Sequence, residues 1–327
     1  MCARRLVVTR FHEVPAGLEL GESSRFSGYR GLRTLDDSHH RIILAETLRS
    51  ALKAGGLCHG LSAETGSVVA VCAVSPLEWD GSHFGLPMAR LFVASSPGVE
   101  PVSIRGLAET TLAEAADSFP LRHVSANIDI DNYECVNALL ASGFEILDIK
   151  RSFFWSRLDG VPTPKFLSRV SEYERTEREE VLSLVEDISF DTRFSRDPQL
   201  PQDKVVAMYR LWLKQLLERA EKGQGCIALV FRKAGKIRAC GVIGETDLAA
   251  YGVPVTFMDK GLYVSSREGI GGYFPVIYQL ARLSLARGMV ARTMVSLNNH
   301  SAVRVLEAMR SGSASTCYEM RFLYPGG

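Results

Sequence analysis

The stretch Ala291-Arg-Thr-Met-Val-Ser-Leu-Asn298-Asn299-His-Ser-Ala302 decides how this chain can fold, because an earlier stretch repeats its layout. The earlier copy reads Val124-Ser-Ala-Asn-Ile-Asp-Ile-Asp131-Asn132-Tyr-Glu-Cys135, and Asn299 lies 167 residues after Asn132. In both copies an alternating strand ends in a polar residue plus Asn, and a helix begins at the small residue three positions on. The pair indicates a duplicated strand–helix unit.

The repetition extends upstream in the same order. Helical patterns at 107–116 and 274–283 superimpose at the same offset, and two glycine turns, at Gly66 and Gly235, each enter an alternating strand. Leu91-Phe92-Val93 matches Leu262-Tyr263-Val264 at an offset of 171, so the first strand-to-helix loop is four residues longer than the second. Repeated units in one order and at nearly constant spacing predict an internal duplication.

A break between the two copies falls near Leu158-Asp-Gly-Val-Pro162-Thr-Pro164, where no periodic pattern continues. We therefore expect two domains, 1–160 and 165–327. The second half reads as two helices, four strands (255–258 and 261–264 counted separately), then helix, strand, helix and strand. Early consecutive strands followed by strand–helix alternation predict an α/β fold with a mixed sheet and helices on both faces.

The composition argues against several classes of function. Lys plus Arg number 38 and Asp plus Glu number 37, so no overall positive charge favours nucleic acid or an anionic membrane. No stretch approaches the roughly 18 apolar residues of a membrane span, and the start of the chain does not resemble an export signal. The seven cysteines are odd in number and lack the short spacings of metal sites. We expect a cytoplasmic protein with reduced cysteines and no metal.

One segment has the features of a phosphate-binding turn. Ser265-Ser-Arg-Glu-Gly269-Ile-Gly271-Gly272 stands between a strand and a helix that begins near Tyr273. Glycines let backbone N–H groups approach a phosphate, and a helix N-terminus adds partial positive charge. The alternative is a glycine turn that only joins two elements. The glycine spacing differs from a Rossmann fingerprint, and no Lys-Ser or Lys-Thr pair follows as in a P-loop.

With these motifs the chain resembles the GNAT N-acetyltransferases, whose coenzyme A pyrophosphate binds at an Arg/Gln-x-x-Gly-x-Gly/Ala turn. Gly269 and Gly271 match that turn, and Asn299 with Ala302 resembles the later Asn-x-x-Ala. Within the superfamily, Leu77-Glu-Trp79-Asp80 and Arg193-Phe194-Ser-Arg-Asp197-Pro198 are similar to the TDP-fucosamine acetyltransferase group. The resemblance implies two tandem GNAT-like domains that use acetyl-CoA or another acyl-CoA. The expected cofactor contacts are Val264, Ser266, Arg267, Gly269, Ile270, Gly271, Gly272, Asn299 and Ala302.

The chain also departs from the family pattern. Ser266 stands where the turn normally begins with Arg or Gln, and Leu306 and Leu139 occupy the position of the tyrosine that protonates the leaving thiolate. The first half has Glu100 and Val102 where phosphates would need bare N–H groups. A carboxylate repels a diphosphate and side chains block the backbone, so we expect coenzyme A in the second half.

Acyl transfer to an amine needs a polarised thioester carbonyl, a neutral amine and a proton for the thiolate. A backbone N–H near Val264 is the candidate for the carbonyl. Glu245, Asp247 and Asp259 are strand-end carboxylates that could accept the amine proton, although each is also typical of a solvated charge. His300, Tyr318 and Tyr324 are further candidates for proton transfer. Trp79, His83 and Phe84 fit a substrate pocket or simple core packing.

Three hypotheses about function follow. The leading one is an N-acyltransferase acting on a small-molecule amine, such as an amino sugar or a specialised metabolite. The second is a catalytically silent GNAT pair that binds acyl-CoA as a sensor or scaffold. The third is transfer from an acyl carrier protein, whose acidic surface would require a positive patch near Arg267, Arg282 and Arg287.

Overall fold

The computed structural model describes residues 6–15, 18, 20, 28–30, 32, 34–64, 66–186, 192–253 and 255–325. Internal contacts divide the chain into two units. Unit 1 comprises Met1–Lys150, Tyr251–Val253 and Ser315–Gly327, and unit 2 comprises Arg151–Ala250 and Pro254–Ala314. The expected second domain, 165–327, included the last strand of the chain, whereas the structure groups most of that strand with unit 1.

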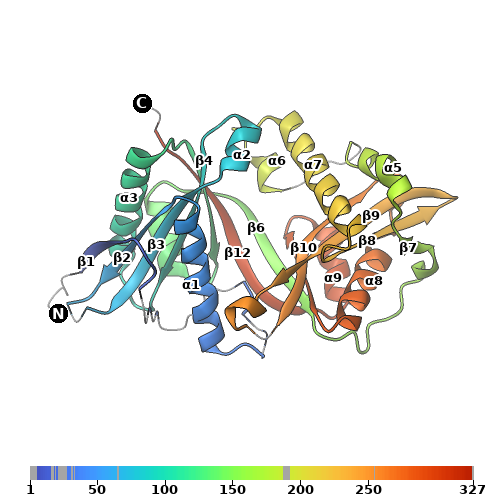
Figure 1. The fold of residues 1–327 in the computed structure, drawn as a ribbon, viewed down its shortest axis with the longest axis horizontal. Helices are drawn as coiled ribbons and strands as arrows, with labels where there is room; N and C mark the ends of the chain where they lie inside the picture. Colours follow the sequence, from blue (N-terminus) through green and yellow to red (C-terminus); the bar gives the residue numbers. More distant parts are fainter. Residues whose placement is uncertain are drawn as a thin grey trace. The chain divides into compact units, whose positions relative to one another are not determined.

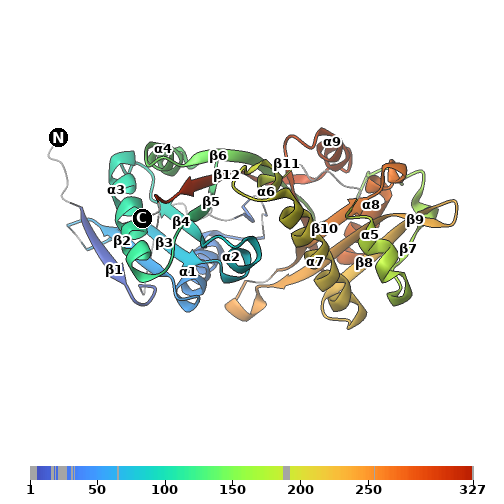
Figure 2. The ribbon, with the colours of Figure 1, turned by 90° about the horizontal axis from the view of Figure 1, so that it is seen from above.

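The described part of unit 1 contains the elements from β1 to β5 and from α1 to α4 (Figures 1 and 2). Within it the strands follow the order β1-β2-β3-β4-β5-β12-β6. β6 (Glu145–Trp155) and β12 (Gly312–Leu323) contribute residues to both units. The other elements are β1 (Val7–Phe11), α1 (Asp37–Lys53), β2 (Leu57–Ser62), β3 (Val68–Pro76), α2 (Glu78–Phe84), β4 (Met88–Ser95), α3 (Pro101–Ser118), β5 (His123–Asp129) and α4 (Tyr133–Ala141).

Helices cover both faces of the unit 1 sheet, as Figure 2 shows for β2 and β3. Ala70, Cys72 and Val74 of β3 pack with α3 and α4, and the alternate residues Val71 and Ala73 pack with α1. Successive side chains of a strand point to opposite faces, so a strand buried on both faces is apolar throughout. This accounts for the continuous apolar run of β3.

The last strand of the chain completes the sheet of unit 1. β12 pairs antiparallel with β5, from Cys317 opposite Asp129 to Leu323 opposite His123. Buried Glu319 is compensated by Lys150 of β6, with 2.9 Å between Oε1 and Nζ, and Arg321 is paired with Glu145. Each of these buried charges has a partner of opposite sign, which the cost of burying an isolated charge requires.

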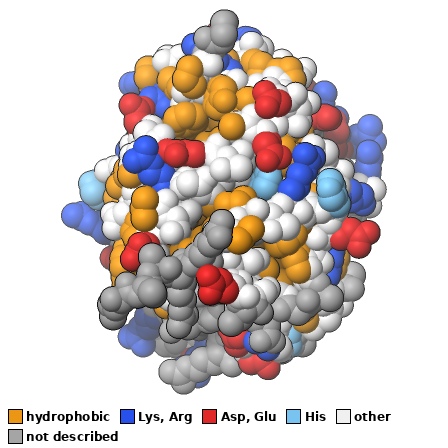
Figure 3. Space-filling view, turned by 90° about the vertical axis from the view of Figure 1, so that its left-hand side faces the viewer, with side chains coloured by type: hydrophobic (Ala, Val, Ile, Leu, Met, Phe, Trp, Pro, Cys, Tyr) orange, Lys and Arg blue, Asp and Glu red, His pale blue; other side chains and the backbone are white. Residues whose placement is uncertain are grey.

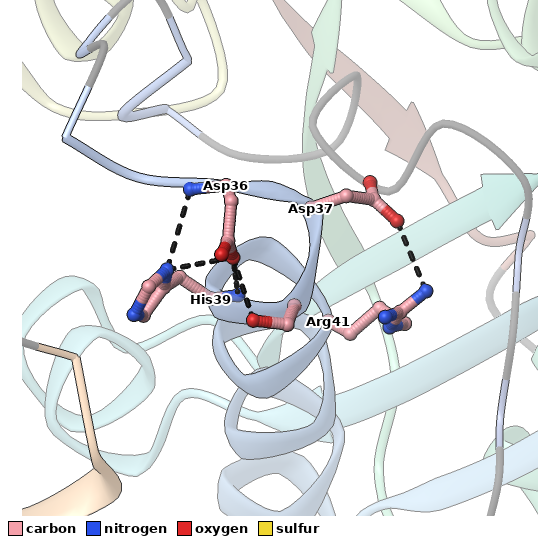
Figure 4. A network of polar contacts seen from close by, with 5 residues as sticks. Asp36, Asp37, His39 and Arg41 are labelled. Atoms are coloured by element: carbon pink, nitrogen blue, oxygen red, sulfur yellow. Dashed lines mark hydrogen bonds and ion pairs between the residues drawn. The ribbon is translucent and has the colours of Figure 1, made fainter.

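Helix α1 begins at a capping box, drawn in Figure 4. Asp36 Oδ1 accepts hydrogen bonds from Ser38 Oγ at 2.6 Å and from His39 N at 3.1 Å, and His39 Nδ1 accepts from Asp36 N at 3.2 Å. These bonds lower the pKa of Asp36 to about 2, the Ser38 bond having the largest effect. Arg41 is bonded to Asp37 one turn earlier in the helix. The side chains thus satisfy N–H groups that a helix start leaves without partners.

Unit 2 contains the remaining elements, and its strands follow the order β6-β11-β10-β9-β8-β7. Its helices are η2 (Leu167–Arg169), η3 (Arg175–Glu177), α5 (Arg178–Ser183), α6 (Arg193–Arg196), α7 (Gln202–Glu221), η4 (Ala249–Tyr251, which ends in unit 1), η5 (Arg267–Gly269), α8 (Tyr273–Ala286) and α9 (His300–Ala308). Its strands are β7 (Val170–Glu172), β8 (Cys226–Lys233), β9 (Lys236–Asp247), β10 (Thr256–Ser265) and β11 (Val290–Ser296).

The unit 2 sheet is also covered on two faces. Ile227, Leu229 and Phe231 of β8 pack with Val276 and Leu280 of α8, and α7 packs against β8 and β9. The predicted mixed α/β architecture is confirmed, with one difference: 255–258 and 261–264, counted as two strands, are parts of the single strand β10. Between them lies a bulge rather than a turn, and residue periodicity alone does not separate the two.

The described surface and interior agree with the balanced composition. Figure 3 shows a face of unit 1 on which basic and acidic side chains are interspersed. None of the described helices combines the length and apolar character needed to cross a membrane. The six described cysteines are free thiols, and burial raises the pKa of Cys58 to about 12. A buried thiol of this kind is inert as a nucleophile.

Candidate functional site

The candidate site begins where two parallel strands of unit 2 stop pairing. β10 and β11 pair only at Phe257 opposite Val290 and Met258 opposite Ala291. On the other side of β10, Met258 lies opposite Glu245 and Lys260 lies opposite Gly244, so Asp259 is the extra residue of a β-bulge. Beyond the bulge, β10 keeps its pairing with β9 and loses its pairing with β11. Its second edge is therefore open towards the glycine turn.

The open edge presents the N–H groups of alternate residues. Ser266 N donates to Arg238 O at 2.9 Å, and the register places Val264 opposite Cys240 and Leu262 opposite Val242. Bonded pairs alternate in an antiparallel ladder, so Val264, like Ser266, directs its N–H towards β9. Gly261, Tyr263 and Ser265 direct theirs to the other edge. The Val264 N–H, expected at the thioester, therefore faces β9, and the N–H groups of its neighbours Tyr263 and Ser265 face the open edge.

Three N–H groups of the turn after β10 are already hydrogen-bonded to backbone oxygens of unit 2. Ser266 N bonds Arg238 O, Gly269 N bonds Ser266 O, and Gly272 N bonds Gly269 O, each at 2.9 Å. Within the described chain, the N–H groups of Ile270, Gly271 and Tyr273 have no hydrogen-bond acceptor. The Ile270 side chain is 85% exposed. N–H groups without an acceptor at the start of α8 can donate hydrogen bonds to a bound anion.

The three glycines of the turn have different reasons to be glycine. A Cβ on Gly269 would lie 2.3 Å from Arg238 O, and one on Gly272 would lie 2.8 Å from Phe231 Cδ1, so both permit close packing on β8 and β9. Gly271 has φ of +91°, a left-handed backbone that side chains rarely adopt, and it is exposed. Gly271 is the position where a side chain would meet a ligand rather than the core.

Asn299 and Ala302 form the N-terminus of α9. Asn299 Oδ1 accepts a hydrogen bond from Ala302 N at 3.1 Å, which is an N-cap, and Ala302 is buried. Leu306, in the position expected for a tyrosine, lies in the core with Trp155 and Met309. The side chain of Asn299 therefore caps α9. Leu306, on the side of α9 that faces the core, has no hydroxyl that could donate a proton.

Both carboxylate oxygens of Asp259, one of the candidate bases, already have partners. Thr246 Oγ1 donates to Asp259 Oδ1 at 2.5 Å, and Arg292 Nη1 lies 3.3 Å from Asp259 Oδ2. Arg292 Nη2 also donates to Ser152 Oγ at 3.0 Å. Both members of the ion pair are largely buried, which leaves the carboxylate bound to a permanent cation. The geometry suits positioning of Arg292 better than proton transfer.

The carboxylate of Glu245, unlike that of Asp259, has no partner among the described residues. It lies opposite Met258, next to the bulge, and its Oε2 is over Gly225, 3.0 Å from where a Cβ would stand. It is half-buried, and in the described chain its carboxylate has neither an ion pair nor a hydrogen bond. Asp247, two residues on, is exposed and accepts from Ala249 N at 2.8 Å. Of the strand-end carboxylates, Glu245 best suits a base.

The other candidates for proton transfer are spread between the units. Tyr318 lies in unit 1, opposite Ile128 of β5, and packs with the core under α3. Tyr324 is also in unit 1, where its carbonyl oxygen accepts from Arg122 Nη1 at 3.0 Å. His300 is exposed at the first residue of α9.

The positive patch expected for a carrier protein is not assembled around α8. Arg267 precedes the helix, whereas Arg282 and Arg287 lie near or at its C-terminal end. A helix of 14 residues is about 21 Å long, so the ends are well separated. Other cations adjoin the turn, however. The ring of Phe166 is 3.8 Å from where a Cβ on Gly271 would stand, and it carries Lys165 and Arg169.

The equivalent turn of unit 1 is occupied by the protein's own carboxylate. Gly98 N donates to Glu134 Oε1 at 3.4 Å, and Glu134 is buried at the start of α4. Glu100 is the residue before α3, and exposed Val102 is in its first turn. Trp79 and His83 stack with ring centroids 5.3 Å apart on α2, while Phe84 is in the core. An internal anion therefore lies where a bound phosphate would be expected.

Comparison with solved structures identifies the fold. The chain is similar to a GCN5-related N-acetyltransferase from Sphaerobacter thermophilus, with 12% identity, a TM-score of 0.60, and coverage of 98% of this chain and 97% of the other. A tandem GNAT protein from the clavulanic acid biosynthesis pathway gives 14% identity, a TM-score of 0.52, and coverage of 99% and 100%. The amino-acid sequence matches no protein-family model and none of the curated proteins.

These similarities establish the fold. The chain has a mixed α/β architecture of two tandem GNAT-like domains, as the repeat predicts. A fungal glucosamine N-acetyltransferase region agrees, with 11% identity, a TM-score of 0.54, and coverage of 98% of this chain and 38% of the larger protein. At such identities the similarity extends to the backbone and not to the substrate.

Proposed function

We propose that the chain is an acyl-CoA-dependent N-acyltransferase, that unit 2 binds the donor, and that the acceptor is a small-molecule amine. The observation that carries the proposal is the continuity of the open edge of β10 with the glycine turn. The edge offers N–H groups at Gly261, Tyr263 and Ser265, and the turn adds those of Ile270 and Gly271. A pantetheine arm can pair with the first set while its pyrophosphate binds the second.

The chemistry assigned to unit 2 uses few residues. A backbone N–H on the open edge polarises the thioester carbonyl, as an oxyanion-hole donor does. Glu245 accepts a proton from the ammonium form of the acceptor, directly or through a water, and the neutral amine attacks the carbonyl carbon. The attacking nitrogen then loses its second proton to water, the carbon–sulfur bond breaks, and the thiolate takes a proton from water, because Leu306 cannot supply one. Asp259 holds Arg292 in place beside the bulge.

The TDP-fucosamine acetyltransferase resemblance narrows the acceptor. We propose an amino sugar nucleotide or a related specialised metabolite, supported by the Arg193-Phe194-Ser-Arg-Asp197-Pro198 motif. That motif forms α6, which Tyr209 anchors through a 2.9 Å bond to Thr192 Oγ1, while Asp197 accepts from Gln199 N at 2.9 Å. Arg193 and Arg196 thereby stand on a fixed short helix, suited to an anionic acceptor.

The proposal is tested by titration and by thiol release. Isothermal titration should show acetyl-CoA binding that coenzyme A competes for, and thiol release should follow with a subset of amino sugars, polyamines and amino acids. Absence of binding heat and of competition would refute the donor assignment.

One observation favours a second candidate, a catalytically silent acyl-CoA-binding protein. Leu306 removes the usual proton donor of the family, and Asp259 is bound to Arg292. Such a protein would bind acetyl-CoA in the titration and release no thiol with any amine. The two assays together therefore separate the candidates.

A further inference from the structure

The segment that enters unit 2 places two cations at the edge of the glycine turn. Lys165 and Phe166 precede η2, and Arg169 ends it. Lys165 Nζ lies 5.6 Å from the centroid of the Phe166 ring, and Arg169 Cζ lies 4.5 Å from it, so both cations lie over the ring. The same ring is in van der Waals distance of a Cβ placed on Gly271. Phe166 therefore fixes the two charges next to the exposed glycine.

The charges around the turn are not balanced by carboxylates. Glu268 is the turn's only acidic residue, and its Oε2 lies 2.5 Å from Arg238 Nη2. Arg232, on the neighbouring β8, is paired with Glu177. Across the described residues, Lys165, Arg169 and Arg267 make no ion pair, and all three are exposed. Cations without a carboxylate partner on the segments that meet at Gly271, together with bare N–H groups, favour a group with several negative charges.

We propose that Lys165 and Arg169 bind phosphate groups of the donor and make unit 2 selective for coenzyme A over a phosphopantetheine arm. This inference rests on the proposed binding of the donor to unit 2. Coenzyme A carries a pyrophosphate and a separate ribose phosphate, whereas the arm of a carrier protein carries one phosphodiester. The turn N–H groups can serve one phosphate, and the cations over Phe166 serve the others. Arg169 also presents its planar guanidinium for a bidentate contact.

The charge pattern explains how the turn works without its usual basic residue. Ser266 replaces the Arg or Gln that opens the family's turn, and its N–H is used by Arg238 O. Lys165 and Arg169, about 100 residues earlier in the chain, restore positive charge from a different element. No local motif joins these positions, because only the packing of Phe166 on Gly271 brings them together.

The test compares three ligands by isothermal titration: coenzyme A, 3′-dephospho-coenzyme A and phosphopantetheine. Wild-type protein should bind coenzyme A most tightly and phosphopantetheine at least tenfold more weakly. The double variant Lys165→Ala/Arg169→Ala should lose at least tenfold in affinity for coenzyme A, with little change for phosphopantetheine. Its coenzyme A binding should also depend less on salt.

The matched control is Lys214→Ala/Lys222→Ala, which removes the same charge from exposed positions of α7 and at its end. Circular dichroism confirms that both variants are folded. Equal coenzyme A affinity in the two double variants would overturn the inference, and so would wild-type protein that binds phosphopantetheine as tightly as coenzyme A. Wild-type protein that binds none of the three ligands would instead refute the proposed function.

Discussion

The turns that lead into α3 of unit 1 and α8 of unit 2 hold equivalent places in the repeat and differ in what their N–H groups meet. In unit 1 the Gly98 N–H meets the Glu134 carboxylate, while in unit 2 the N–H groups of Ile270 and Gly271 meet no acceptor in the described chain. The counterpart of Glu134 at the repeat offset is Ser301, which carries no charge. The position that supplies the carboxylate to the unit 1 turn thus supplies no charge in unit 2.

The strands beside the two turns differ in the same sense. β4 pairs with β3 without a register shift from Ala70 opposite Ser95 to Pro76 opposite Ala89, whereas β10 has the bulge at Asp259. β4 and β5 also pair over four residues, from Met88 to Leu91, and β10 and β11 over two. A bulge bends its strand and ends pairing. The parallel strands beside the turn therefore separate earlier in unit 2 than in unit 1.

The largest expected effect separates the two carboxylates beside this opening. Glu245→Gln should lower the turnover rate about one hundredfold or more with little change in donor affinity, because the variant cannot accept the amine proton. Asp259→Asn should weaken acceptor binding, seen as a raised KM, because it removes the ion pair that holds Arg292 beside the bulge. It should keep the pH profile of the wild-type protein. Steady-state kinetics across pH measures both. If the acid limb of the pH–rate profile is lost in Asp259→Asn and persists in Glu245→Gln, then Asp259 is the base and Glu245 is not.

The assignment of the donor to unit 2 is the next to test. Gly271→Asp adds a side chain and a negative charge at the open turn, so acetyl-CoA binding should fall at least tenfold, about 1.4 kcal/mol. Val102→Asp makes a similar change in unit 1, where the residue is exposed, and should leave binding unchanged. Titration calorimetry on folded variants decides. If Val102→Asp abolishes binding and Gly271→Asp does not, the halves have been assigned the wrong way round.

Much of this comparison could be predicted from the sequence. The offset between Asn132 and Asn299 predicts the duplication, and the glycines from 269 to 272 predict the turn between strand and helix, because both are local patterns. The comparison of Glu100 with the open glycine turn also predicts which half should bind the donor. The carboxylate that closes the unit 1 turn, however, comes from Glu134 on a different element.

The remaining features depend on pairing between distant residues. Whether Val264 or Tyr263 directs its N–H to the open edge follows from the register with β9, which the bulge at Asp259 shifts by one. A slip of one residue reverses every such assignment. The role of Asp259 depends on Arg292, 33 residues later. The pairing of β12 with β5 joins residues 188 (Cys317 and Asp129) to 200 (Leu323 and His123) positions apart, and nothing in either strand specifies that partner.

A smaller difference between the units should appear in mild acid. Burial lowers the pKa of His40 and of His59 in unit 1, the latter despite Glu114 at 3.2 Å, whereas the single histidine of unit 2, His300, is exposed. A folded-state pKa below the unfolded value of about 6.5 means that protons bind preferentially to the unfolded chain. The contribution of these two histidines to the stability of unit 1 is therefore present above about pH 6.5 and is lost as pH falls towards their lowered pKa values.

Hydrogen exchange resolved by peptide, at pH 7.5 and pH 5.5 and corrected for the intrinsic rate, measures this difference. Peptides of β2 and α1 should lose more protection than those of β8 and α7. The variant His40→Gln should reduce the pH dependence in α1 without changing that of unit 2. Equal loss in both units, or earlier loss in unit 2, would show that the buried histidines do not set the acid response.

The smallest expected effect concerns the cap of α1. Asp36→Ala removes the acceptor for Ser38 Oγ and His39 N, and the loss of an N-cap should lower the melting temperature of unit 1 by roughly 2 to 4 °C. In Asp36→Ser the side chain can still accept a hydrogen bond from the His39 N–H, so most of the melting temperature should be retained. Asp37→Ala loses only the exposed ion pair with Arg41 and should change the melting temperature little. Because the pKa of Asp36 is lowered to about 2, the contribution of its charge is present above the unfolded pKa of about 3.8 and is lost as pH falls through 2. Donor binding should be unaffected in all three variants, since α1 belongs to unit 1 and the open turn to unit 2. A change in acetyl-CoA affinity in Asp36→Ala at neutral pH would therefore show that the two units are coupled, and that unit 1 does more than complete the fold.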